Sequence, residues 1–155
     1  MKFRFAAKED VPLILSFIKE LADYENLLDE VVATEADLEK SLFAQKRAEV
    51  LFALVDEKEV GFALFFHNYS TFLGKAGLYL EDLYIKPDVR GQGIGKQLLK
   101  KLAQIALERD CGRLEWWCLD WNQTSIDFYL SLNAEPMDEW TSYRLTGENL
   151  KKLAE

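Results

Sequence analysis

The stretch that decides the fold is YLEDLYIKPDVRGQGIGK, residues 79–96. Its first half is aromatic and aliphatic, as in a strand, and the turn Lys86-Pro87-Asp88 ends it. A glycine-rich loop follows and opens a helix, whose first N–H groups lack intrahelical acceptors and carry partial positive charge. Glycines allow a phosphate to approach the backbone closely. We therefore predict an anion site formed by Gly91, Gly93 and Gly95.

Two common nucleotide motifs do not match this loop. A P-loop ending at Gly95-Lys96 requires glycine at position 90 and serine or threonine at position 97, where the chain has Arg90 and Gln97. The glycine spacing G-x-G-x-G also differs from the dinucleotide fingerprint G-x-G-x-x-G. What remains is an Arg-Gly-x-Gly-x-Gly loop between a strand and a long helix.

Hydrophobic periodicity around the loop predicts a mixed α/β protein. A capping box at Thr34 and Asp37 starts the second helix, and a charged turn over 56–59 joins two strands into a hairpin. We expect a single domain over residues 1–155. The predicted strands are 2–6, 50–55, 60–68, 77–85, 114–119 and 143–146, and the predicted helices are 11–24, 34–43, 94–109 and 125–132.

Charge is unevenly distributed in this acidic chain, which has 27 Asp and Glu against 19 Lys and Arg and a formal charge of −8. Residues 20–39 contain acids and no base, whereas residues 86–101 are rich in bases. The acidic balance argues against nucleic-acid binding. Each zone is either a solvated face or a binding region for one of two oppositely charged ligands, and both interpretations stay open here.

Several other classes of site do not fit the composition. Cys111 and Cys118 lack C-x-x-C spacing, and His67 is the only histidine, so we expect no metal site, no disulfide framework and no Ser-His-Asp triad. No apolar stretch approaches the ~18 residues of a membrane span, and no signal-peptide core follows Met1. We expect a cytoplasmic protein that does not bind a membrane.

The loop Val89–Gly95 resembles the acyl-CoA pyrophosphate loop of the GNAT N-acetyltransferases. The resemblance extends over almost the whole chain and narrows to the branch of spermidine/spermine (diamine) and thialysine N-acetyltransferases. It implies a GNAT (acyl-CoA N-acyltransferase) fold, with a mixed, partly splayed sheet flanked by helices, and a homodimer. The other matching segments are residues 20–25, 73–75, 79–82, 121–122 and 125–129.

The same resemblance implies acetyl-CoA as the acyl-donor substrate. The backbone of residues 83–85 is expected to pair with the pantetheine arm, and residues 90–96 are expected to hold the pyrophosphate. Asn122 and Ser125 are expected to contact the donor further along. The implied donor-binding residues are Leu83, Tyr84, Ile85, Arg90, Gly91, Gln92, Gly93, Ile94, Gly95, Lys96, Asn122 and Ser125.

For catalysis, the resemblance implies that Tyr129 is the general acid for the departing CoA thiolate and that Glu81 binds the amine and removes its proton. The chemistry requires such groups, because an alkylammonium with a pKa of ~10.4 must be deprotonated before it attacks a thioester. Taken without the resemblance, Tyr129 is a packing residue. The implied amine-pocket residues are Tyr24, Glu25, Glu81 and Asp82.

Regular alternation along a strand predicts that Glu81 and Asp82 point to opposite faces and form no carboxylate pair. The chain departs from the polyamine enzymes at Thr141, where they carry an acid, and around Leu130-Ser131, where they often carry a base. A shorter diamine, a lysine-like amino acid and another primary amine therefore stay open as substrates.

The expected function is acetyl transfer from acetyl-CoA to a primary amine of a small cationic molecule. Direct attack in a ternary complex is expected, because neither cysteine has a basic partner for thiolate catalysis. Two alternatives stay open. One is an acetyltransferase that acts on a protein lysine or N-terminus, and the other is a non-catalytic acyl-CoA-binding sensor.

Overall fold

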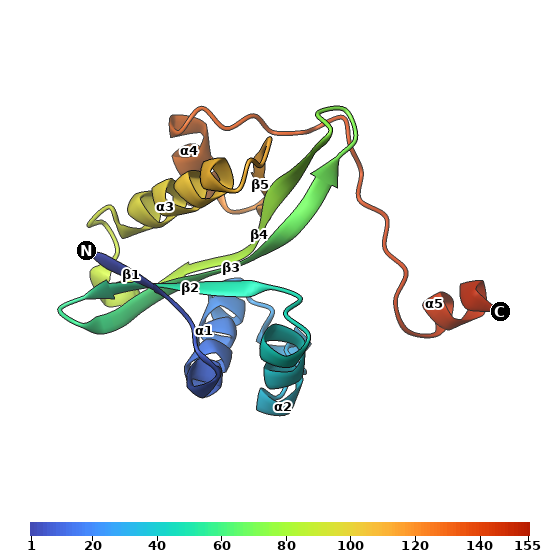
Figure 1. Cartoon of the computed structure of the whole chain (residues 1–155), viewed down its shortest axis with the longest axis horizontal. Coiled ribbons are helices and arrows are strands. Elements are labelled where there is room, and N and C mark those ends of the chain that lie inside the picture. Colours follow the sequence, from blue (N-terminus) through green and yellow to red (C-terminus); the bar gives the residue numbers. More distant parts are fainter. The chain divides into compact units, whose positions relative to one another are not determined.

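A five-stranded mixed sheet in the order β1-β2-β3-β4-β5 forms the centre of the computed structural model, which describes residues 1–155 (Figure 1). All neighbouring strands are antiparallel except β4 and β5, which are parallel. The predicted mixed α/β class is confirmed. The strands are β1 (Lys2–Phe5), β2 (Glu49–Val55), β3 (Lys58–Ser70), β4 (Lys75–Ile85) and β5 (Leu114–Trp116).

The helices largely follow the predicted periodicity. The bounds of α1 are those predicted, and the Thr34 hydroxyl accepts the Asp37 amide at 3.2 Å to cap α2. A π-helical segment, Glu39–Ala44, continues α2. The α-helices are α1 (Val11–Tyr24), α2 (Glu35–Leu38), α3 (Ile94–Glu108), α4 (Gln123–Ser131) and α5 (Gly147–Ala154), and the 3-10 turns are Lys8–Asp10, Leu28–Glu30 and Pro87–Val89.

Helices cover both faces of the sheet: α1 and α2 lie on one face and α3 on the other (Figure 1). The α1 face is packed around Phe17, which contacts the rings of Phe52, Phe62 and Tyr84 at centroid distances of 6.1, 5.6 and 5.8 Å. These buried aromatic side chains anchor β2, β3 and β4 to α1. The core therefore fixes the carboxyl end of β4 against the middle of α1.

A β-bulge interrupts β4 at Glu81. Leu64 of β3 is paired with Asp82, while the next residue, Phe65, is paired with Leu80, so Glu81 has no partner. Leu64 packs against the α1 cluster, whereas the Phe65 ring lies 5.7 Å from the Arg109 guanidinium that follows α3. Since paired residues share a face, Leu80 faces α3 and Asp82 faces α1. The premise of regular alternation at Glu81 and Asp82 is therefore wrong.

Backbone contacts divide the chain into two compact units, Met1–Trp117 and Cys118–Glu155. The first unit contains the sheet and α1 to α3, and the second contains α4 and α5. The prediction of one domain over residues 1–155 is not tested by this division and stays a prediction. None of the helices is long and apolar enough to cross a membrane.

The predicted elements differ from the structure mainly in its last third. The strand predicted over 114–119 ends at Trp116, and residues 143–146 form no strand. Residues 143–146 are exposed and have no strand partner, so their apolar pattern alone does not produce a strand. The structure instead has α5, which the sequence analysis did not predict.

Candidate functional site

The glycine loop connects the 3-10 turn Pro87–Val89 to α3. Gly91 has φ +80° and Gly93 has φ +76°, in the left-handed region that favours glycine. A Cβ built at either position meets no heavy atom within 4 Å. The backbone conformation therefore demands glycine here, and the space above the loop is open.

The start of α3 offers hydrogen-bond donors at this loop. The first intrahelical bond runs from the Gln97 amide to the Gly93 carbonyl, 3.1 Å apart. The amides of Ile94, Gly95 and Lys96 therefore have no acceptor within the helix. Open backbone, amide donors and the Lys96 charge together fit the diphosphate of acetyl-CoA.

The carboxyl end of β4 has one edge without a strand partner. β5 pairs with β4 only from Leu78 to Leu80, whereas β3 pairs with β4 as far as Ile85. Backbone groups on the β5 side of residues 83–85 thus lie beyond the last strand contact of the sheet. Such an edge can pair with an extended amide-containing ligand, which fits the predicted role of Leu83, Tyr84 and Ile85.

Arg90 joins several predicted site residues. Its Nε donates to the Ile85 carbonyl oxygen at 2.9 Å. Its guanidinium carbon lies 4.9 Å from the ring centroid of Tyr24 and 5.6 Å from that of Tyr84. The structure therefore brings the end of α1, the end of β4 and the glycine loop together through one side chain.

Three carboxylates from α1 and β4 form an acidic cluster, Glu25, Glu81 and Asp82. Burial raises the pKa of Asp82 to about 7, and the negative charges of Glu81 and Glu25 add to this shift. Burial also raises the pKa of Glu25. Glu81 is exposed, whereas Asp82 is half-buried. The cluster can attract a cation, and its half-buried member is suited to accept a proton near neutral pH.

The remaining predicted residues belong to the second unit. The Asn122 side-chain oxygen accepts the Ser125 amide at 3.3 Å and caps α4, and Asn122 is buried. Tyr129 lies in α4, half-buried, with its ring 5.5 Å from that of Phe128. The helix cap accounts in part for asparagine at position 122. The predicted roles of Asn122, Ser125 and Tyr129 stay predictions.

Sequence reasoning missed two features of the first unit. The bulge at Glu81 leaves no local signal, because it is defined by pairing with β3. The contact between Arg90 and Tyr24 also joins residues far apart in the sequence. The acidity of residues 20–39 and the basicity of 86–101 were the available signals, but they suggest ligands and do not predict a contact between the two zones.

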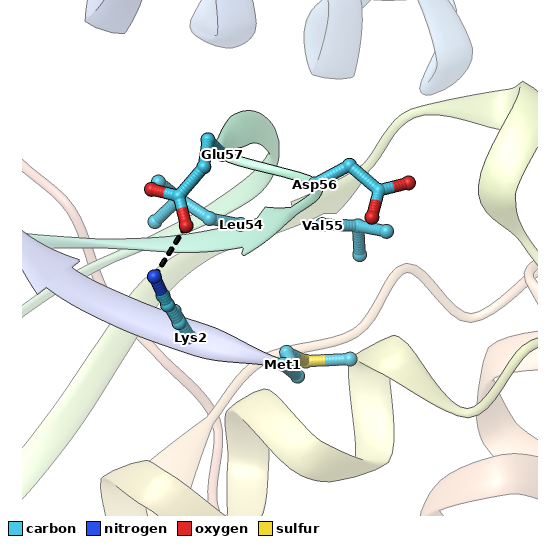
Figure 2. Close-up of a pocket in the computed structure, with 6 residues that line it drawn as sticks. All are labelled: Met1, Lys2, Leu54, Val55, Asp56 and Glu57. Carbon is cyan, nitrogen blue, oxygen red and sulfur yellow. Dashed lines mark hydrogen bonds and ion pairs between the residues drawn. The ribbon is translucent and has the colours of Figure 1, made fainter.

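A separate pocket lies where the start of β1 meets the end of β2 and the turn that follows it. Figure 2 shows its lining, in which Lys2 points toward Glu57 and forms an ion pair with it. None of the predicted site residues lines this pocket. No group of three His, Cys, Asp or Glu side chains is placed to hold a metal ion.

Comparison with known proteins identifies relatives over nearly the whole chain. The model of the acetyltransferase (GNAT) family matches residues 16–133. Thialysine N-epsilon-acetyltransferase of Bos taurus is 39% identical, over 97% of this chain and 95% of its own length. L-ornithine N5-acetyltransferase of Arabidopsis thaliana is 31% identical, over 98% of this chain and 87% of its own length.

A solved structure has the same architecture. An integron cassette protein from the mobile metagenome of V. cholerae superimposes with a TM-score of 0.80 and 33% identity, covering 99% of this chain and 96% of that one.

Proposed function

Because this chain belongs to the GNAT family of acetyltransferases, we propose that it transfers an acetyl group from acetyl-CoA to a primary amine of a small cationic molecule. The predicted family, the GNAT fold and the enzyme class are confirmed. The acceptor is proposed to be a diamine, a polyamine or a lysine-like amino acid. The observation that carries this choice is the acidic cluster Glu25, Glu81 and Asp82, with its half-buried carboxyl.

The names of the relatives agree with a cationic acceptor. The bovine relative is named for thialysine and the Arabidopsis relative for ornithine, two amino acids with a side-chain amine. An ammonium group is attracted by a carboxylate cluster that is partly shielded from water. Since the cluster adjoins the loop through Tyr24 and Arg90, the amine side and the donor side are neighbours in the first unit.

On the donor side, acetyl-CoA supplies the acetyl thioester. We propose that the loop from Arg90 to Lys96 holds its diphosphate and that the backbone of 83–85 pairs with its pantetheine arm. The left-handed glycines, the amides without intrahelical acceptors and the edge of β4 beyond β5 support this assignment. Asn122 and Ser125 are proposed as further donor contacts.

The proposed chemistry moves one acetyl group and two protons. The bound ammonium first gives one proton to a carboxylate. Its nitrogen then forms a C–N bond with the acetyl carbon while the C–S bond breaks, and it loses a second proton as the amide forms, which replaces the proton that Tyr129 gives to the CoA sulfur. Glu81, acting directly or through water, is the acceptor that the family resemblance implies. Asp82 is a second candidate, because its raised pKa suits an acceptor at neutral pH. Tyr129 is proposed to return a proton to the CoA sulfur.

Direct attack in a ternary complex is supported by the burial of Cys111. Cys111 is buried, and Cys118 donates a weak hydrogen bond to the Leu119 carbonyl. A buried thiol such as that of Cys111 is poorly placed to attack a thioester, which covalent catalysis by a thiolate requires. We further propose a cytoplasmic homodimer, as the family resemblance implies.

The experiment is a thiol-release assay in which acetyl-CoA is combined with a panel of amines. We expect CoA release with thialysine, ornithine, lysine and short diamines, and little release with neutral monoamines of matched length. Glu81→Gln and Asp82→Asn should reduce release, whereas Lys2→Gln, in the separate pocket, should not.

Two outcomes would replace the proposal. Preferential acetylation of a peptide lysine or a protein N-terminus would favour the macromolecular acceptor. Acetyl-CoA binding by calorimetry without turnover on any acceptor would favour the sensor.

A further inference from the structure

Arg90 occupies an unusual place for a residue of an anion-binding loop. It makes no ion pair. Its guanidinium instead lies over the ring of Tyr24, which ends α1, and over the ring of Tyr84 in β4. Its Nε is bonded to the Ile85 carbonyl. The side chain is therefore held in place by two rings and one backbone acceptor.

This arrangement leaves part of the guanidinium available. Arginine carries five N–H donors in a planar fork, and Nε uses one of them. The four N–H donors of the terminal nitrogens remain for a phosphate oxygen, while the flat face stays stacked on the rings. Arg90 can thus bind the donor and contact the amine-side wall at the same time.

We propose that Arg90 is a positioning residue. It couples the donor loop, residues 90–96, to the wall of the proposed amine pocket at Tyr24. The inference rests on the proposed function, since it assigns the two sides to acetyl-CoA and to the amine. Tyr24 holds the guanidinium where a phosphate will need it, and a bound phosphate in turn fixes Arg90 against Tyr24. Because binding free energies are linked, each ligand then strengthens the binding of the other.

Alternative explanations of the contact make different predictions. If Arg90 serves only the phosphate, removal of the Tyr24 ring leaves acetyl-CoA affinity unchanged. If Tyr24 serves only the amine, removal of its ring also leaves acetyl-CoA affinity unchanged. Coupling alone predicts that a change at the end of α1 weakens a ligand held by the loop.

The test is a double-mutant cycle on acetyl-CoA affinity, measured by isothermal titration calorimetry without amine. Tyr24→Leu removes the ring, and Arg90→Lys keeps the charge but loses the planar stacking. An exposed cation–π contact predicts that Tyr24→Leu raises the Kd for acetyl-CoA about two- to fivefold. The double variant should bind no more weakly than Arg90→Lys alone.

Two controls accompany the cycle. Tyr24→Phe keeps the ring and should keep the wild-type Kd for acetyl-CoA. Leu28→Ala changes another exposed apolar residue after α1 and should also leave this Kd unchanged. Thermal melts of all variants check that the fold is intact.

A second readout is the amine KM, which Arg90→Lys should raise although the residue belongs to the donor loop. Strictly additive effects of Arg90→Lys and Tyr24→Leu, or an unchanged Kd in Tyr24→Leu, would overturn the coupling while leaving the proposed function in place. A wild-type protein that binds no acetyl-CoA would overturn both.

Discussion

The donor loop and the acidic cluster are neighbouring parts of one unit, but they arise in different ways. The loop is made by local backbone: two left-handed glycines and the free amides at the start of α3. The cluster is made by tertiary structure: a bulge places Asp82 on the α1 face, and burial beside Glu25 and Glu81 raises its pKa.

Because of this difference, substitutions should affect the two sites in different ways. A backbone site depends on conformations that few residues adopt, so most substitutions in it remove binding altogether. A desolvated carboxyl depends on its surroundings, so substitutions there change proton affinity and pH dependence before they remove binding. Single substitutions in the glycine loop should therefore abolish acetyl-CoA binding, whereas substitutions in the acidic cluster should weaken the amine-side function gradually.

The largest expected effect is on the donor side. Gly93→Val places a β-branched residue at φ +76°, which valine strongly disfavours. We expect acetyl-CoA binding to be lost in a protein that still folds, because the added Cβ meets no other atom. Calorimetry with acetyl-CoA and circular dichroism measure the two properties. Normal binding by this variant would mean that the loop does not hold the donor.

An intermediate effect is expected at Tyr129, which belongs to the second unit. Tyr129→Phe removes only the hydroxyl, so a general acid predicts a fall in kcat of about 100-fold or more. The Kd for acetyl-CoA should stay near the wild-type value. Steady-state kinetics across pH, with calorimetry alongside, measure both. A kcat equal to that of wild type at every pH contradicts the acid role.

The smallest effect on activity is expected at the acidic cluster, where the pH dependence of the reaction is measured. If Asp82 accepts the proton, a pKa of about 7 predicts a wild-type kcat/KM about tenfold lower at pH 6 than at pH 8. Asp82→Asn should flatten this dependence, whereas Glu81→Gln should keep it and raise the amine KM. The opposite pattern would assign the proton to Glu81, as the family resemblance implies.

The same variant gives a stability measurement with a defined sign. Because the pKa of Asp82 is raised on folding, the native state binds the proton more tightly and loses stability as pH rises from 3.8 to about 7. At about 1.36 kcal/mol per pKa unit this loss is at most about 4 kcal/mol. Asp82→Asn should therefore stabilise the protein more at pH 8 than at pH 5 in urea unfolding. Equal stabilisation at both pH values would exclude a shifted Asp82.

The features predicted well from sequence are those that local chemistry determines. The bounds of α1 agree with its apolar spacing, α3 begins at the predicted Ile94, and the Thr34 cap is present. The glycine loop lies, as predicted, between a strand and a long helix. These elements need no distant partner to be recognised.

The features that were missed depend on partners elsewhere in the chain. Residues 143–146 have a strand-like pattern but no neighbouring strand, and α5 has Leu150 and Leu153 on an exposed short helix whose signal is weak. The bulge at Glu81 and the contact between Arg90 and Tyr24 are defined only once β3, β4 and α1 are assembled. The arrangement of the predicted site residues of the first unit was therefore not predicted, and their roles stay predictions.

The extra residue in β4 also changes how this strand tolerates mutation. Leu78 and Leu80 serve the core on one side of the sheet, while Tyr84, also at an even position, serves the core on the other. Deleting Glu81 would make Leu80 and Asp82 neighbours opposite Phe65 and Leu64, so regular alternation would keep the leucines on the α3 face and Tyr84 on the α1 face. A homologous strand aligned with a gap at this position can therefore keep the same side chains in the same layers, because the residue that it lacks is the one that β3 leaves unpaired.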